Sequence, residues 1–179
     1  AQYDVGHKRQ GVGACWESAL HTYLDTRMSK MTADKYYEYL RDTNNSFPTT
    51  SQPAIGEVVA CLEKLKEEGY TDVIAIALSS GISGACSSYT VAGLMVDGIN
   101  VHPFDSEVSC KPEGWYAIKA ANLIKEGKNS NQIISALNEM KKVSKAYFMA
   151  DDLSHLQRGG RLSGAQALVG SLLQVKPLL

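Results

Sequence analysis

The stretch DVIAIALSSGISGACSS, residues 72–88, decides the fold class of this 179-residue chain. Residues 72–78 form a short, continuous apolar run, which is typical of a strand buried on both faces of a parallel sheet. The polar loop SSGISG follows at residues 79–84. The next segment carries Tyr89, Leu94 and Val96 and ends at Gly98, which predicts a helix.

Further elements are expected on both sides of this stretch. Residues 99–104 predict a second strand and residues 146–150 another, while Thr32 is placed to begin a short helix that ends near Asp42. Three more helices are predicted from apolar residues at helical spacing: Ile55, Val58, Val59, Leu62 and Leu65 before Gly69; Trp115, Ile118 and Leu123; and Ile133, Ile134, Leu137 and Met140. This order predicts an α/β fold, with right-handed crossovers and a mainly parallel sheet that helices cover on both faces.

The composition of the sequence changes after residue 150. The segment DDLSHLQRGGRLSG at 151–164 is polar and glycine-marked, and residues 165–175 are apolar. An apolar segment needs a surface to pack against. We therefore predict a first α/β domain over residues 1–143 and the start of a second α/β domain over residues 144–179, which is expected to be incomplete.

Composition excludes several functions. Eighteen basic and nineteen acidic side chains leave a formal charge of −1, which disfavours nucleic acid and anionic membrane surfaces as partners. The longest apolar stretches are too short to span a membrane, and no signal-peptide pattern opens the sequence. The four cysteines lack the spacing of a zinc site, so we expect reduced thiols, no metal and a cytoplasmic protein.

The first polar cluster is FPTTSQP, residues 47–53. Its hydroxyls, including that of Thr50, and the amides at the start of the following helix would suit an anion. The alternative is that Thr50 or Ser51 only caps a helix that begins at Pro53.

The second polar cluster is the loop SSGISG. Ser79, Ser80 and Ser83 supply hydroxyls, and Gly81 and Gly84 let the backbone approach a bound carboxylate or phosphate. The loop has neither the spacing nor the lysine of a P-loop, and it does not match GxGxxG. The alternative is a tight turn with a serine cap.

The third polar cluster is QRGGR, in which Arg158 and Arg161 could bind a carboxylate or phosphate in bidentate fashion. The alternative is a solvated loop after a short helix. Asp105 and Ser106, which follow the second predicted strand, either support a site or form a plain turn. No histidine has metal-ligand spacing and no GxSxG motif is present, so triad chemistry has no support.

Taken in order, PTTSQP, LSSGISG, FDSE and DDLSHLQRGGRLSGAQALVGSLLQVKPLL resemble the DegV family of bacterial fatty-acid-binding proteins. The resemblance runs from about Thr22 to Leu179. It implies two α/β domains that clasp one fatty acid, with the carboxylate at the domain junction and the acyl tail buried. Residues 6–18 lack the strand pattern with which members of the family usually open.

The resemblance also implies which residues hold the carboxylate. These are Thr50 and a serine of SSGISG, with Ser80 the first choice over Ser79 and Ser83, together with Arg161. It implies a carrier without catalysis, metal or cofactor, which presents the fatty acid to a Dak-like, ATP-dependent fatty acid kinase subunit. Two alternatives remain: a transferase or hydrolase that uses the serine loop on a phosphorylated substrate, and a remnant that binds nothing.

Overall fold

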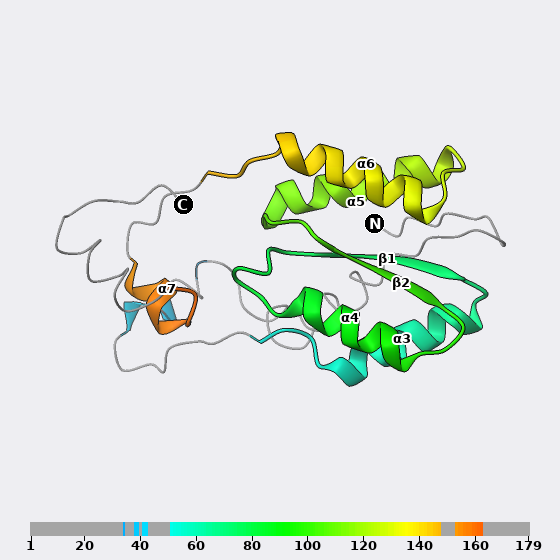
Figure 1. The fold of residues 1–179 in the computed structure, drawn as a ribbon. Coiled ribbons are helices and arrows are strands. Elements are labelled where there is room, and N and C mark those ends of the chain that lie inside the picture. Colours follow the sequence, from blue (N-terminus) through cyan, green and yellow to red (C-terminus); the bar gives the residue numbers. More distant parts are fainter. Residues whose placement is uncertain (1–33, 35–37, 40, 43–50, 148–152, 163–179) are drawn as a thin grey trace.

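The computed structural model describes residues 34, 38–39, 41–42, 51–147 and 153–162. These residues form one α/β unit followed by a short helix (Figure 1). The elements are α3 (Ile55–Glu67), β1 (Asp72–Ala77), α4 (Ala85–Met95), β2 (Asn100–Asp105), α5 (Cys110–Lys125), α6 (Ser130–Val143) and α7 (Ser154–Arg158).

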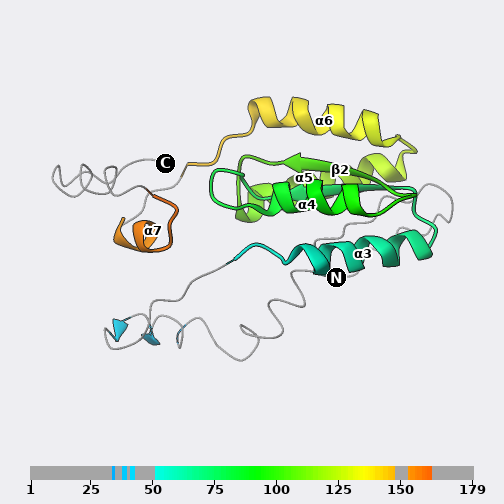
Figure 2. The ribbon, with the colours of Figure 1, turned by 60° about the horizontal axis from the view of Figure 1, so that its bottom comes forward.

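Strands β1 and β2 are parallel, in a register that pairs Asp72 with Asn100 and Ala77 with Asp105. Helix α4 connects them. Helices α3 and α4 cover one face of the strands and α5 and α6 cover the other, as Figures 1 and 2 show. The predicted α/β class, with parallel strands and helices on both faces, is therefore confirmed.

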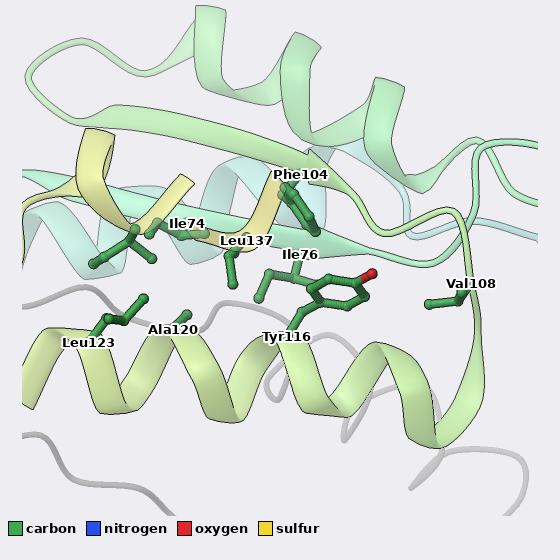
Figure 3. Close-up of a cluster of buried hydrophobic side chains, with 9 residues drawn as sticks. Ile74, Ile76, Phe104, Val108, Tyr116, Ala120, Leu123 and Leu137 are labelled. Atoms are coloured by element: carbon green, nitrogen blue, oxygen red, sulfur yellow. The ribbon is translucent and has the colours of Figure 1, made fainter. Parts of the chain in front are cut away.

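Strand β1 is buried on both faces, because Val73 to Ala77 are each at most 7% exposed. Alternate residues of the strand enter two separate cores. On the α5 and α6 face, Ile74 and Ile76 pack with a cluster that Figure 3 shows. That cluster also contains Phe104, Val108, Tyr116, Ala120, Leu123, Ile133 and Leu137.

The opposite core joins β1 to α3 and α4 and contains Val58, Leu62, Val73, Ala92, Val96 and Ile99. Gly93 allows α4 to lie close to β2, because a Cβ at this position would sit 2.8 Å from the Cβ of Val101. Leu94 faces the other way and is 83% exposed, so that part of the predicted helix does not contribute to this core.

Local signals explain where the helices begin and end. Asn129 and Gln132 form a capping box at the start of α6, with hydrogen bonds of 3.0 and 3.1 Å. Helix α3 ends two residues before Gly69, whose φ of 92° suits a residue without a Cβ.

Some sequence expectations differ from the structure or lie beyond it. Ala146 and Tyr147, the first residues of the predicted strand at 146–150, are in no strand, and the rest of that segment lies outside the described residues. The short helix expected from Thr32 is described only at isolated positions. Cys86 and Cys110 are thiols, as expected, but Cys61 is disulfide-bonded, which corrects the expectation for that residue.

The division into domains at residues 143 and 144 stays a prediction. Helix α7 follows that boundary, at the place where the sequence suggests a short helix before QRGGR. Most of residues 144–179 lie outside the described residues, including the apolar segment 165–175.

Candidate functional site

Two loops meet at the carboxyl ends of the parallel strands. The loop at residues 79–84, called the serine loop below, follows β1, and the turn at residues 105–109 follows β2. The Ser79 amide donates to the Val108 carbonyl at 2.8 Å, and the Ser80 amide donates to Asp105 Oδ1 at 3.1 Å. In open parallel sheets, this end of the strands is where ligands usually bind.

The three serines of the serine loop are used differently. Ser79 Oγ accepts the Gly81 amide and Ser83 Oγ accepts the Ala85 amide, each at 3.2 Å. A hydroxyl that accepts an amide still has its own hydrogen to donate to a further acceptor. Ser80 is exposed, whereas Ser79 and Ser83 are half-buried.

The first polar cluster reaches the serine loop through Gln52. A Cβ at Gly84 would collide with the end of the Gln52 side chain, 2.7 Å from its Cδ. Helix α3 begins at Ile55 with Ala54 as N-cap and no side-chain cap, so a Ser51 cap on a helix from Pro53 is wrong. Thr50 lies outside the described residues.

The third polar cluster also reaches the serine loop. Arg161 Nε donates to the Ile82 carbonyl at 3.2 Å, and Arg161 Nη1 donates to the Gly159 carbonyl at 2.5 Å. Arg158 is exposed at the end of α7. The structure therefore brings segments from all three polar clusters together, although they are separated by tens of residues in the sequence.

Two titratable groups beside the serine loop have shifted pKa values. Burial alone would raise the pKa of the Asp105 carboxyl, but hydrogen bonds from Ser80 and Glu107 and the Lys141 ammonium lower it below its usual range. Burial and then the charge of Asp105 raise the pKa of the Cys86 thiol. Cys86 is therefore a poor nucleophile, and Asp105 is a weak base.

A small hollow of about 60 Å³ lies near the same end of β1. Its lining consists of Ile76, Cys110, Glu113, Gly114 and Ala117. Burial raises the pKa of the Glu113 carboxyl. The hollow is much smaller than the roughly 300–1,000 Å³ of ordinary ligand pockets, so it cannot enclose a long acyl chain.

The described residues contain no group of three or more side chains that could hold a metal ion, and none of their helices is long and apolar enough to cross a membrane. His102 is the third residue of β2 and pairs with Ile74 of β1, so it precedes the strand ends that carry the serine loop and the turn after β2. Its Nε2 donates to Asp72 Oδ1 at 2.8 Å. His102 is therefore engaged with Asp72 and is not placed to act as a base for the serine loop.

Several residues of this region carried no signal in the sequence. Nothing in the local sequence distinguishes Gln52 from the rest of its motif or Lys141 from the other lysines, although Lys141 Nζ donates to the Asp105 carbonyl at 3.1 Å. The contacts of Gln52 with Gly84 and of Lys141 with Asp105 join elements that are distant in the sequence, so only the structure reveals them. The sequence places Asp105 after a predicted strand, and its hydrogen bonds to the Ser80 and Glu107 amides favour a supporting role over a plain turn.

The fold and the converging loops define the class of this protein: an α/β domain with a polar site at the carboxyl ends of its parallel strands. Comparison with known proteins then places it in a family. The model of the DegV family, whose members are described as uncharacterised, matches residues 21–179. The chain belongs to the DegV family.

Individual relatives agree with this assignment. The chain is 60% identical over 145 residues to protein DegV of Bacillus subtilis, covering 80% of this chain and 51% of that protein. The crystal structure of B. subtilis DegV, a fatty acid binding protein, superposes with a TM-score of 0.71 and 58% identity, covering 82% of this chain and 51% of that one. A fatty acid binding DegV family protein of Streptococcus agalactiae gives a TM-score of 0.75 at 30% identity, covering 83% and 52%. The chain thus spans about half the length of these relatives.

Proposed function

We propose that this chain binds one long-chain fatty acid and presents its carboxylate to an ATP-dependent kinase partner. The carboxylate is held at the serine loop by hydroxyls of Thr50 and Ser80, with Ser79, Ser83 and Arg161 around it. The observation that carries the proposal is convergence: Gln52 packs on Gly84, and Arg161 bonds to Ile82.

The chemistry of the serine loop suits a carboxylate. Hydroxyl hydrogens donate to an anion in charge-assisted hydrogen bonds, which are stronger than neutral ones. Helix α4 begins directly after the loop, and its first turn contains no acidic residue that would neutralise the positive end of the helix dipole. Arg161 adds a positive charge at the loop. No metal is needed for this kind of binding.

The relatives support a fatty acid as the source of that carboxylate. DegV of B. subtilis and the S. agalactiae protein are both described as fatty acid binding. Ile82 offers an apolar, 38% exposed side chain within the loop itself. The hollow by Glu113 is too small for the acyl tail, so we assign the tail to the second domain that the sequence predicts after residue 143.

A carrier without catalysis fits the loop better than the transferase or hydrolase alternative. Hydrolysis through a serine needs a base within hydrogen-bond reach. Asp105 lies beside Ser80, but its pKa is lowered, and His102 is paired with Asp72. Ser80, Gly81 and Ile82 are exposed, which leaves the head group accessible to a kinase.

Organic extraction of the purified chain, followed by mass spectrometry, tests ligand binding. We expect one long-chain fatty acid per chain, or stoichiometric uptake of oleate after removal of lipid. If several preparations contain no lipid above background and take up neither oleate nor palmitate, this chain is not a fatty acid carrier.

Turnover assays separate the carrier from the enzyme. The isolated chain is expected to have no activity on ATP, acyl thioesters or phosphate esters, and acyl phosphate should form only with a cognate kinase subunit. The Arg161→Ala variant should lower that coupled rate. Hydrolysis by the chain alone, abolished by Ser80→Ala, would instead favour the transferase or hydrolase.

A further inference from the structure

A single carboxylate oxygen ties the two loops of the site together. Asp105 Oδ1 accepts the Ser80 amide at 3.1 Å and the Glu107 amide at 3.0 Å. One of these amides belongs to the serine loop after β1 and the other to the turn after β2. Asp105 is therefore the side chain through which the end of β2 fixes the backbone of the serine loop.

The turn that carries Asp105 has a demanding backbone conformation. Within the turn Glu107 has a φ of 57°, and Cys110, the first residue of α5 directly after it, has a φ of 59°; these are the positive φ values that the structure describes outside glycine. Such conformations persist only where surrounding contacts enforce them. Ser106 Oγ supports the turn from within, because it donates to the Val108 carbonyl at 3.1 Å and is fully buried.

Lys141, on α6, holds the same turn from outside. Its Nζ donates to the Asp105 carbonyl at 3.1 Å and to Glu107 Oε1 at 3.0 Å, and it lies 5.3 Å from the centre of the Phe104 ring. The ammonium thus bonds to the backbone of Asp105 while the carboxylate of Asp105 bonds to the serine loop. Lys141 also offsets part of the negative charge that Asp105 brings to the region.

The charge of Asp105 is the wrong sign for attracting a carboxylate. A lowered pKa keeps Asp105 ionised at neutral pH, so its charge alone would weaken the binding of an anion. The reason for an aspartate at this position must therefore lie in the geometry that its oxygen imposes on Ser80.

We infer that Asp105 is a positioning residue for the fatty acid head group: it orients Ser80 and the serine loop, and Lys141 holds it in place. This inference rests on the proposed function. It requires an acceptor oxygen at residue 105 and does not require a negative charge.

Two substitutions at residue 105 separate the acceptor from the charge. Asp105→Asn retains an oxygen that can accept both amides, whereas Asp105→Ala removes it. By isothermal titration of the delipidated chain with oleate, Asp105→Ala should weaken binding at least about ten-fold. Asp105→Asn should bind within about three-fold of the parent, or more tightly, because a negative charge is gone.

The lysines on α6 provide a matched pair. Lys141→Ala should weaken oleate binding several-fold. Lys142→Ala should not, because Lys142 pairs with the exposed Glu139 on its own helix and makes no other side-chain hydrogen bond or ion pair among the residues that the structure describes. If Asp105→Ala binds like the parent, or if Asp105→Asn is as weak as Asp105→Ala, the inference is overturned.

Hydrogen exchange gives a readout that does not depend on ligand. The Ser80 and Glu107 amides should exchange at least about ten-fold faster in Asp105→Ala than in the parent, and near the parent rate in Asp105→Asn. Unchanged exchange in Asp105→Ala would overturn the positioning role. A parent chain that binds no oleate would refute the proposed function, while the exchange rates would still decide whether Asp105 positions the loop.

Discussion

The two ends of the parallel strands each contain an aspartate with several hydrogen-bond donors, and at the carboxyl end these donors include backbone amides. At the amino end, Asp72 accepts from three side chains: His102 at 2.8 Å, Ser130 at 3.1 Å and Thr71 at 3.0 Å. At the carboxyl end, Asp105 accepts the backbone amides of Ser80 and Glu107.

This difference separates a structural polar cluster at the amino end from the proposed binding loop at the carboxyl end. At the amino end, the side chains of Thr71, His102 and Ser130 are all directed at Asp72, so their hydrogen bonds tie α6 to the strands. At the carboxyl end, Asp105 takes two main-chain amides besides the Ser80 hydroxyl, and the hydroxyls of Ser79 and Ser83 accept main-chain amides. The hydrogens of the Ser79 and Ser83 hydroxyls are therefore available at the end where the loops meet.

Substitutions that remove a hydroxyl group should show the largest difference in oleate affinity between the proposed site and the amino end of the strands. Ser80→Ala and Thr50→Val should each weaken oleate binding by roughly 1.5–3 kcal/mol, the cost of a lost hydrogen bond to a charged group. Ser130→Ala should leave the affinity unchanged. Titration calorimetry at constant pH measures all three variants.

The same titration decides which serine matters. If Ser80→Ala binds like the parent while Ser79→Ala or Ser83→Ala binds weakly, the head group contacts a different hydroxyl of the loop. If Ser130→Ala is the variant that loses binding, the roles of the two ends are reversed.

Two glycines should separate folding from binding. Gly98, near the amino end of β2, has a φ of 84°, so Gly98→Ala should lower the free energy of unfolding by about 1–2 kcal/mol. In Gly84→Ala, the three described atoms nearest to the new methyl group all belong to the flexible end of Gln52. That side chain can move away, so stability should change little while oleate affinity falls several-fold.

Urea denaturation and oleate titration of both glycine variants check this contrast. A Gly84→Ala variant that binds oleate as tightly as the parent would mean that Gln52 does not bring the first polar cluster to the site.

The smallest expected effect concerns pH at the amino end. Burial alone would raise the pKa of the Asp72 carboxyl, but hydrogen bonds from His102, Thr71 and Ser130 outweigh it and lower this pKa below its usual range. A carboxyl whose pKa is depressed on folding adds stability above its unfolded pKa of about 3.9, and this stability is lost as the pH falls through the folded value. Because the carboxyl is 29% exposed, the contribution should be no more than about 1 kcal/mol.

Unfolding by urea at pH 7 and at pH 3 measures this contribution. Asp72→Asn should be less stable than the parent at pH 7 and should lose less stability on acidification. An equal loss in both proteins would show that Asp72 does not contribute to the acid sensitivity.

Local sequence patterns predicted most of the described elements. The apolar run at 72–78 became β1, the segment 99–104 became β2 shifted by one residue, and apolar spacing located α3, α5 and α6. These signals work because each lies within one element. Exposure was less predictable: Trp115 is 49% exposed, because α5 turns Tyr116 toward the core.

The site was predictable only in outline. The polar clusters were visible as motifs, and their positions at strand ends suggested a common location. The bonds that join them link residues far apart: Ser80 to Asp105, and Ile82 to Arg161. Such pairs depend on strand register and helix packing, which no local pattern contains.

The binding of a carboxylate at the carboxyl end of the strands can be tested directly by titrating oleate into the ¹⁵N-labelled chain and following its amide signals. We expect the amides of residues 79–87 to shift in proportion to bound oleate, while those of Asp72, His102 and Ser130 stay in place. Saturable binding that shifts the amino end and leaves residues 79–87 unmoved would contradict this assignment.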